Sequence, residues 1–224
     1  MSEFAGKTLS KTKQVMLERI RIALKDVPSS EQAQDIPIDR LYRSSTKHTN
    51  LLELAAERIA EYRARVEIIN ELELPVKIRE SLERNQIRKL VVPHDLPEAW
   101  KPTHLELTSE QAIQLEHHEL EGVDGVLTAC ALAIAETGTI VLDHARGQGR
   151  RALTLIPDFH LCVVLESQIV DNLPAAMRAL EPGVLAGRPL TFISGPSATS
   201  DIELSRVEGV HGPRTLEVLI IRQD

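Results

Sequence analysis

The chain is poor in cysteine, in aromatic residues and in long apolar segments. Its 224 residues include two cysteines, Cys130 and Cys162, and 3% aromatic residues. The cysteines lie far apart and in no Cys-x-x-Cys spacing, which excludes a cysteine-ligated zinc or iron–sulfur site on this chain alone and fits a reducing compartment. No apolar segment approaches the ~20 residues of a membrane-spanning helix, and the N-terminus lacks the apolar core of a signal peptide. We therefore expect a cytoplasmic globular protein that binds no metal.

An excess of positive charge is also missing. The chain carries 26 Lys and Arg against 33 Asp and Glu, a net charge of −7. Residues 1–90 hold 17 basic and 14 acidic residues (net +3), whereas residues 91–224 hold 9 and 19 (net −10). A nucleic-acid binder usually needs a basic face, and aromatic side chains for base stacking are scarce here. The composition argues against a nucleic-acid partner.

The first half of the chain has almost no glycine, because ten of the eleven glycines lie after residue 121. Glycine is needed where the backbone adopts a positive φ or approaches a ligand closely. We therefore expect the loops that carry function in the second half of the chain.

The N-terminal residues predict one amphipathic helix followed by a linker. Apolar residues recur at helical spacing between residues 8 and 27, and basic residues fill the other face. Such a helix is expected to dock on a core or on a partner protein, with a membrane surface as the alternative. Residues 28–49 contain proline and serine and show little periodicity, which is typical of a linker. The sequence therefore predicts an arm over residues 1–48 and an α/β domain over residues 49–224.

The body begins with a pattern typical of a βαβ unit. Residues 50–62 predict a helix with Asn50 as its N-cap. A short strand (65–70), a helix (76–86) and a second short strand (89–92) follow. Strand, helix and strand in this order predict two parallel strands.

Short apolar segments dominate the second half and predict most of the sheet. Several of them follow one another too closely for a helical crossover, so antiparallel pairs are expected beside parallel ones. We therefore predict an α/β fold with a mixed central sheet flanked by helices. The expected strands cover residues 125–128, 139–143, 152–156, 160–166, 190–194 and 216–222, and the expected helices cover residues 109–118 and 173–180.

Two patterns in the second half imitate known binding motifs. Residues 147–152 (Gly-Gln-Gly-Arg-Arg-Ala) match the Gly-x-Gly-x-x-Ala dinucleotide fingerprint, which must open a helix. The residues that follow are typical of a strand ended by Pro157, so we interpret the pattern as a hairpin loop whose arginines suit an anionic ligand. His117 and His118 are adjacent, and neighbouring side chains on a helix point about 100° apart, so we do not expect them to chelate one ion.

Three polar segments are stronger candidates for a binding site. They are residues 135–139 (Ala-Glu-Thr-Gly-Thr), 195–203 (Gly-Pro-Ser-Ala-Thr-Ser-Asp-Ile-Glu) and 209–213 (Gly-Val-His-Gly-Pro). Backbone amides and hydroxyls at the end of a strand can bind carboxylates and phosphates. Each segment alone also fits an ordinary turn, a capped helix start or a structural histidine.

Taken together, these segments resemble the LUD domain family, and residues 17–24 and 151–164 share further features with it. The resemblance covers nearly the whole chain. It implies a fold like that of the ribose-5-phosphate isomerase, glucosamine-6-phosphate deaminase and CoA-transferase group. It also implies a part in oxidising L-lactate to pyruvate together with two sister proteins, which carry iron–sulfur ligands. This chain would then be the cluster-free component, with no cofactor of its own and iron–sulfur clusters on its partner subunits.

The resemblance and the chemistry of the three segments together predict one pocket. In it, His211 or Glu136 would handle the hydroxyl proton of the substrate, and hydroxyls and backbone amides would bind the substrate carboxylate. Because strand-terminal loops of an α/β sheet meet at one edge, we expect the segments to converge there. The expected substrate-binding residues are Thr137, Gly138, Thr139, Gly195, Ser197, Thr199 and Asp201.

Two other functions fit the same sequence. The chain could be a stand-alone binding protein or an isomerase-type enzyme for a small anionic or phosphorylated metabolite, which would need no partner. It could also be a scaffold in which the N-terminal arm holds the iron–sulfur subunits. The sequence leaves open whether the chain turns over substrate by itself, as a subunit of an L-lactate-oxidising oxidoreductase.

Overall fold

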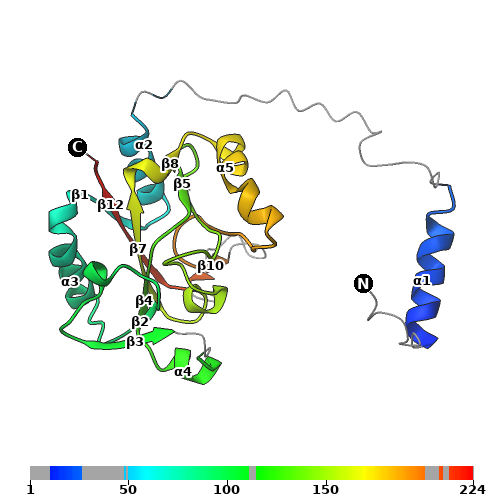
Figure 1. The fold of residues 1–224 in the computed structure, drawn as a ribbon, viewed down its shortest axis with the longest axis horizontal. Coiled ribbons are helices and arrows are strands. Elements are labelled where there is room, and N and C mark those ends of the chain that lie inside the picture. Colours follow the sequence, from blue (N-terminus) through cyan, green and yellow to red (C-terminus); the bar gives the residue numbers. More distant parts are fainter. Residues whose placement is uncertain are drawn as a thin grey trace. The chain divides into compact units, whose positions relative to one another are not determined.

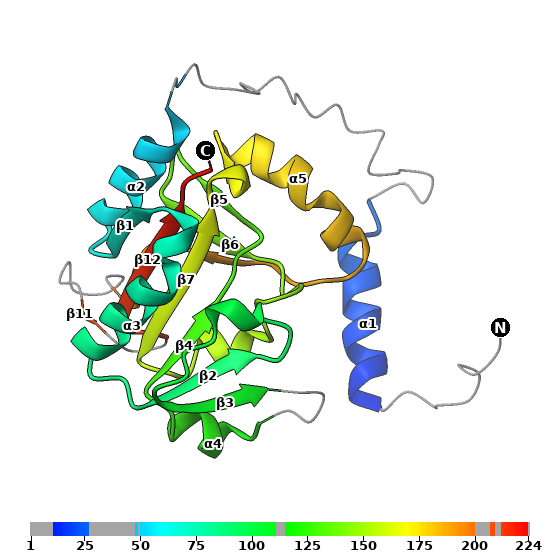
Figure 2. The same ribbon diagram turned by 60° about the vertical axis from the view of Figure 1, so that its left-hand side comes forward.

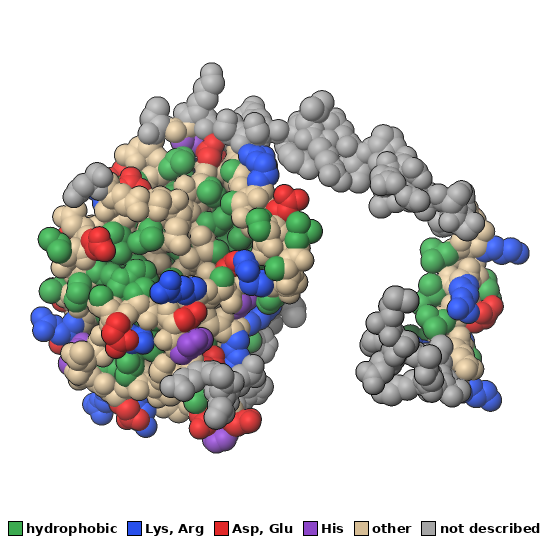
Figure 3. All heavy atoms as spheres, in the orientation of Figure 1, with side chains coloured by type: hydrophobic (Ala, Val, Ile, Leu, Met, Phe, Trp, Pro, Cys, Tyr) green, Lys and Arg blue, Asp and Glu red, His purple; other side chains and the backbone are tan. Residues whose placement is uncertain are grey.

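The computed structural model describes residues 11–26, 48, 50–110, 115–199, 207–208 and 212–223. The chain divides into two compact units, residues 1–41 and residues 42–224. In the first unit, helix α1 (Lys11–Ala23) ends before the predicted end at residue 27, the predicted start at residue 8 lies outside the described residues, and none of the residues described in that unit is buried. Figure 3 shows hydrophobic side chains along one side of α1 and charged ones along the other. Helix α1 therefore presents an amphipathic surface of its own.

The described part of the second unit contains one large sheet of six strands, and every pairing in it is parallel. Its two longest strands are almost entirely apolar and are buried along nearly their whole length. Such continuous apolar strands are typical of a parallel sheet that is covered on both faces. In spatial order the strands are β1 (Arg65–Ile69), β12 (Thr215–Ile221), β7 (Phe159–Leu165), β4 (Gly125–Thr128), β2 (Lys89–Pro93) and β3 (Glu106–Glu110).

A second, smaller sheet holds the longer antiparallel pairs. Strands β5 and β6 form a hairpin, β6 also pairs antiparallel with β9, and β5 pairs parallel with β8. The α/β prediction is therefore confirmed, but the prediction of a mixed central sheet is wrong. The longer antiparallel pairs, among them the β5–β6 hairpin, lie in a sheet of their own and leave the central sheet parallel. The strands are β8 (Ile169–Val170), β5 (Leu132–Ile134), β6 (Thr139–Leu142) and β9 (Thr191–Ile193).

Two helices and the second sheet cover the two faces of the central sheet. Helix α3 (Leu74–Arg84) packs Ile78 and Leu82 against one face, in a cluster with apolar side chains of β2, β4, β7 and β12. On the other face, α2 (Leu51–Glu61) and the second sheet pack against β7 and β12. In Figure 1, α3 lies to the left of β7 and β12, while β5, β8 and α5 (Leu173–Leu185) lie to their right. Figure 2 shows α3 crossing in front of β12.

Local signals explain where these helices begin. The side chain of Asn50 accepts a hydrogen bond from the backbone N–H of Glu53 at 3.2 Å, which caps α2 as predicted. Helix α5 begins in the same way, because the side chain of Asn172 accepts from the N–H of Ala175 at 3.0 Å. Proline stands in the first turn of both α3 and α5, where its missing N–H costs no hydrogen bond.

The predicted pair of parallel strands is confirmed, because β1 and β2 run parallel in one sheet, with β12, β7 and β4 between them. Two other local predictions are wrong because tertiary packing overrides them. The expected strand at 152–156 is a 3-10 helix (Arg151–Thr154), in which Leu153 is buried among Val91, Leu120 and Val126. The helix expected at 109–118 is not found as such: residues 109–110 belong to strand β3, and residues 117–118 begin helix α4 (His117–Glu121). Residues 111–114 lie outside the described residues.

None of the helices in the described residues is long and apolar enough to cross a bilayer. This finding agrees with the absence of a long apolar segment in the sequence.

Candidate functional site

A cavity of about 210 Å³ lies at the amino ends of β7 and β12. Ligands of open α/β sheets are expected at the carboxyl edge, so this position differs from the general expectation. The chain that leaves β9, residues 194–197, forms one wall, and Gly212 and Pro213 form another. We call it the amino-edge cavity. Its polar lining includes Arg151, Thr154, His160, Thr191, Ser194 and Ser197.

Two of the predicted binding residues line this cavity. Gly195 and Ser197 stand on the wall that leaves β9, and the backbone N–H of Ser197 donates to the carbonyl of Pro213 at 2.8 Å. That bond joins the second and third predicted segments. Ser197 is half-buried, so its hydroxyl can reach a small ligand.

Three more predicted residues lie beside the cavity. The Thr139 hydroxyl is 2.8 Å from the Thr137 hydroxyl and 2.8 Å from that of Ser194, which lines the cavity. This row of hydroxyls ties the turn between β5 and β6 to the segment after β9. Two segments that lie far apart in the sequence are thereby held together.

Close packing against α2 explains why glycine occurs at positions 138 and 195. A Cβ atom on Gly138 would lie 2.4 Å from the backbone carbon of Arg58, and one on Gly195 would lie 2.6 Å from the Cβ of Tyr62. Both glycines have positive φ, 60° and 93°. The two turns therefore rest directly on the C-terminal end of α2, where only glycine fits.

The remaining predicted residues have other positions or are not described. Glu136 is exposed, and its backbone N–H donates to the carbonyl of Asp171 at 3.0 Å. Thr199 belongs to strand β10 (Ala198–Thr199), which pairs with β11 (Val207–Glu208). The expected proton-handling residue His211 and the expected binding residue Asp201 lie outside the described residues. Their convergence on the cavity stays a prediction.

His160 also lines the cavity, although no role in the site was predicted for it. It is 1% exposed, and its Nε2 atom lies 2.8 Å from the Thr128 hydroxyl on β4. A signal was available, because β7 is apolar except for His160 and Cys162 and both positions point to the same face. A polar side chain inside a fully buried strand must be hydrogen-bonded and is often functional.

The arginine-rich loop divides its side chains between structure and surface. Arg150 donates to Glu110 at 2.7 Å and also to the carbonyl of Leu115, so it holds the loop against β3. Arg151 is exposed at the mouth of the amino-edge cavity. Its 3-10 helix is only four residues long. The Gly147–Ala152 pattern therefore does not open the longer helix that a dinucleotide fingerprint requires.

A second cavity of about 450 Å³, the carboxyl-edge cavity, lies past the carboxyl end of β4. It is lined by Cys130, Asp143, Arg146, Gln148 and Gln168 among others. Burial alone would raise the pKa of Asp143, but hydrogen bonds from Gln148 and Arg188 outweigh burial and hold this pKa below its ordinary value. Gln168 donates to the Cys130 carbonyl at 2.8 Å and accepts from the N–H of Leu165 at 2.8 Å. The Gln148 amide therefore binds the Asp143 carboxylate, and the Gln168 amide binds the backbone.

Metal ligands are not gathered at either cavity. Within the described residues, no group of three or more His, Cys, Asp or Glu side chains is arranged to hold a metal ion. The donors that line the amino-edge cavity are hydroxyls, backbone amides, one imidazole and one guanidinium. This set suits a small anion that also carries a hydroxyl or carbonyl oxygen.

Comparison with known proteins places the chain in a family. A lactate utilization protein C from Deinococcus radiodurans is 49% identical over 165 residues, which cover 74% of this chain and 76% of that protein. One from Halalkalibacterium halodurans is 34% identical over 120 residues, which cover 52% of this chain and 48% of that protein. The crystal structure of a duf162 family protein from Deinococcus radiodurans, 42% identical, superposes with a TM-score of 0.67 over 76% of this chain and 96% of that chain. The LUD domain model matches residues 52–221, both cavities included, and the chain belongs to the LUD domain family.

Proposed function

We propose that this chain is the cluster-free subunit of a system that oxidises L-lactate to pyruvate, acting with iron–sulfur partner proteins. The observation that carries the proposal is the 49% identity over 165 residues to a lactate utilization protein C. That similarity extends across most of the LUD domain rather than over one short motif. We also propose that the fold belongs to the ribose-5-phosphate isomerase, glucosamine-6-phosphate deaminase and CoA-transferase group.

The amino-edge cavity is the proposed substrate site. Its volume of about 210 Å³ suits a molecule of a few heavy atoms better than a nucleotide. The Ser197 hydroxyl and the amides around Gly195 would donate to the carboxylate of the substrate. Arg151 at the mouth would attract the anion, since a guanidinium pairs well with a carboxylate.

The reaction requires more than binding. Lactate becomes pyruvate when the C2 hydroxyl loses its proton and C2 loses its hydrogen with two electrons. We assign the hydroxyl proton to His211 or Glu136, because each carries a base that is suitable near neutral pH when it is held against the substrate. His160 supplies a further imidazole on the cavity wall. The electrons would leave through the iron–sulfur clusters of the partner subunits.

The N-terminal arm is the proposed contact with those partners. Val15, Met16 and Ile20 of α1 are 46%, 60% and 52% exposed, and none of the residues described in that unit is buried. An amphipathic helix with an uncovered apolar side is suited to a groove on another protein. A chain lacking residues 1–48 should therefore lose the partners in co-purification and keep the Tm of the body.

Deletion of the gene tests the proposed pathway. The deletion strain should fail to grow on L-lactate as the only carbon source and grow normally on pyruvate. The full chain supplied on a plasmid should restore growth, and the chain lacking residues 1–48 should not. Normal growth of the deletion strain on lactate would refute the proposal.

A ligand screen separates this proposal from a stand-alone role on a sugar phosphate. The purified chain should gain thermal stability with L-lactate or pyruvate, because a ligand that binds only the folded state stabilises it by about 2.7 kcal/mol at one hundred times Kd. Stabilisation by a sugar phosphate alone would favour the stand-alone binding protein or isomerase. Stabilisation by none of these would favour the scaffold.

A further inference from the structure

The two cysteines, remote in the sequence, are neighbours in the fold. The parallel register places Cys162 on β7 opposite Thr128 on β4, and Cys130 follows two residues later, where the chain leaves β4. The Cys162 sulfur lies 3.9 Å from the carbonyl oxygen of Ala129, the residue directly before Cys130. Both side chains belong to the same core cluster, with exposures of 3% and 0%. Paired residues on neighbouring strands lie about 5 Å apart, and Cys130 stands two positions beyond the residue that is paired with Cys162. Each thiol nevertheless interacts with the other, and a disulfide requires their Cα atoms to come within about 7 Å.

The chemical surroundings make the pair reactive. A hydrogen bond with Cys130 holds the pKa of Cys162 below its ordinary value despite burial, and the imidazole of His160 and the hydroxyl of Thr128 contribute in the same direction. The interaction with Cys162, together with burial, raises the pKa of Cys130. The Cys130 thiol donates a hydrogen bond to the side-chain oxygen of Gln168 at 3.5 Å, and the Cys162 thiol faces the Ala129 carbonyl at 3.9 Å. The two pKa shifts make Cys162 the member of the pair that ionises more readily. The thiolate is the form that attacks peroxides and disulfides.

One sulfur has a route to solvent. Cys130 lines the carboxyl-edge cavity of about 450 Å³, which is wide enough to admit a small peroxide. Cys162 lies behind it in the core, between Cys130 and the His160–Thr128 pair. Cys130 is itself buried, so a peroxide would reach it from the cavity that it lines, and Cys162 behind it would be the resolving sulfur. These are the two parts that a reversible thiol switch requires.

We propose that Cys130 and Cys162 form an intramolecular disulfide when the protein meets a peroxide, and that this site is a reversible oxidation site. The disulfide would lock the start of β5 to the central strand β7. It would also take the Cys162 sulfur away from His160, whose imidazole lines the amino-edge cavity. Oxidation at the carboxyl edge of the sheet would therefore change the surroundings of His160 at the amino-edge cavity.

The step balances with peroxide as the oxidant. The Cys130 sulfur attacks one peroxide oxygen while its proton passes to the Cys162 thiolate, the O–O bond breaks, and hydroxide leaves. The leaving hydroxide takes that proton from Cys162 and becomes water. The Cys162 thiolate then attacks the Cys130 sulfenic acid, the S–O bond breaks, and a second hydroxide leaves. Two sulfurs lose one electron each, and the peroxide is reduced by two electrons. A dithiol reductant reverses the change by thiol–disulfide exchange.

Thiol counting on the full chain tests the proposal. The reduced protein is treated with hydrogen peroxide in its folded state, unfolded in urea, alkylated and weighed by mass spectrometry. Both thiols should disappear together with the loss of two hydrogen atoms, the protein should stay the same oligomer, and dithiothreitol should restore both thiols. Tryptic peptides that contain Cys130 and Cys162 should be found linked to each other.

Matched variants keep the result interpretable. Cys130→Ser and Cys162→Ser should each keep a single thiol that forms no internal disulfide, and circular dichroism checks that both variants are folded. Folded wild-type protein that keeps both thiols, while the same peroxide oxidises them in urea, would overturn the proposal. Loss of one thiol without the other, or linkage between two chains, would also overturn it. The wild-type result decides the matter even where a variant fails to fold.

Discussion

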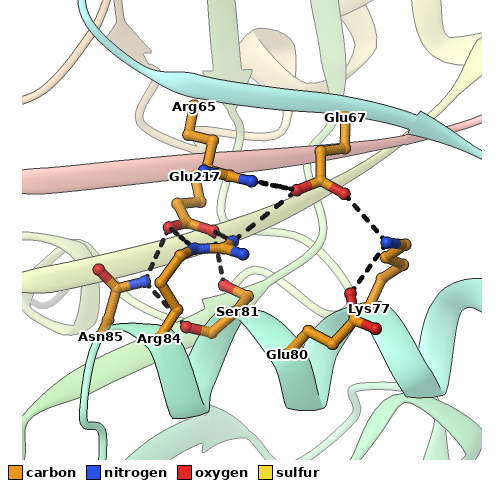
Figure 4. A network of polar contacts seen from close by, with 8 residues as sticks. All are labelled: Arg65, Glu67, Lys77, Glu80, Ser81, Arg84, Asn85 and Glu217. Carbon is orange, nitrogen blue, oxygen red and sulfur yellow. Dashed lines mark hydrogen bonds and ion pairs between the residues drawn. The ribbon is translucent and has the colours of Figure 1, made fainter.

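The guanidinium of Arg84 lies 2.6 Å from the buried carboxylate of Glu217, and this contact ties helix α3 to the central strand β12. Glu217 is 4% exposed and also accepts hydrogen bonds from Ser81 at 2.8 Å and from Asn85 at 2.7 Å. Figure 4 shows these donors converging on the carboxylate from one helix. A charge buried in this way is tolerated because every lone pair finds a partner.

Removing Arg84 should show how strongly an unpaired Glu217 carboxylate lowers the free energy of unfolding. Arg84→Ala leaves the Glu217 carboxylate buried with only neutral donors, so the free energy of unfolding should fall by about 3 kcal/mol. Urea unfolding measures the change. The control is Arg79→Ala on the same helix, since Arg79 is exposed and 3.9 Å from Glu83. This control should change stability by about 0.5 kcal/mol or less. Equal losses for the two variants would contradict the role given to the Arg84–Glu217 pair.

Asp143 should make stability depend on pH at the acid end. Hydrogen bonds from Gln148 and Arg188 outweigh burial and keep its pKa low in the folded state. Its contribution is therefore fully present above the ordinary aspartate value of about 3.9 and is lost as the pH falls through the lower folded pKa. Asp143→Asn should be less stable than wild type near neutral pH, and the difference in their free energy of unfolding should become smaller below about pH 4.

Urea midpoints across this range measure the Asp143 effect. Asp158→Asn serves as the control, because the Asp158 side chain is 69% exposed. If the difference in free energy of unfolding between Asp143→Asn and wild type stayed constant with pH, the Asp143 side chain would stabilise the fold through its shape and not through its charge.

Alanine substitutions at Gly138 and Gly187 test whether the β5–β6 turn packs on α2. Both have positive φ, 60° and 78°, but a Cβ on Gly138 would clash with the Arg58 backbone, whereas nothing lies within 4 Å of one on Gly187. Gly187→Ala should cost about 1 kcal/mol from backbone strain alone, and Gly138→Ala about 3 kcal/mol once the clash is added. Similar losses in thermal or urea unfolding would show that the turn does not rest on α2 in solution.

Ser197 and His211 test the proposed substrate site. Ser197→Ala should weaken binding of the stabilising ligand about tenfold or more, because a hydrogen bond to a charged group is lost. Ser167→Ala removes an exposed hydroxyl, whose partner is Gln223, and should leave binding unchanged. His211→Ala should abolish growth on lactate and leave the fold intact. If Ser197→Ala kept the ligand affinity of the wild type, the ligand would not bind at Ser197.

Local signals predicted the elements better than their arrangement. The N-cap and apolar spacing of α2 were correctly predicted, and the helix at α3 was expected within two residues of its position, because such signals act within a few residues. The partner of β1 could not be read from the sequence, since β1 pairs with β12 almost at the other end of the chain. The division into two sheets was missed for the same reason. Short apolar segments indicate strands but not which strands they join.

The candidate site was predicted in part. Glycine and hydroxyl patterns pointed to the turn at 136–139 and to the segment after β9, and the structure brings these two together through Thr139 and Ser194. His160 received no role, because a single histidine in an apolar strand is ambiguous until its Thr128 contact and the cavity are visible. The nearness of Cys130 to Cys162 depends on strand pairing alone, and no spacing rule could indicate it. His211 and Asp201 fall outside the described residues and stay predictions.

The position of β12 has a consequence for how the body is made. This strand, which ends at Ile221, lies between β1 and β7 and pairs with both. During synthesis, β1 therefore cannot pair with β12 until residues 215–221 have left the ribosome. Until then, the edges of β1 and β7 that β12 will cover stay open to other chains, and pairing over such a long sequence separation is slow. Loss of residues 215–221 would leave a gap between β1 and β7 inside the sheet, not a frayed end.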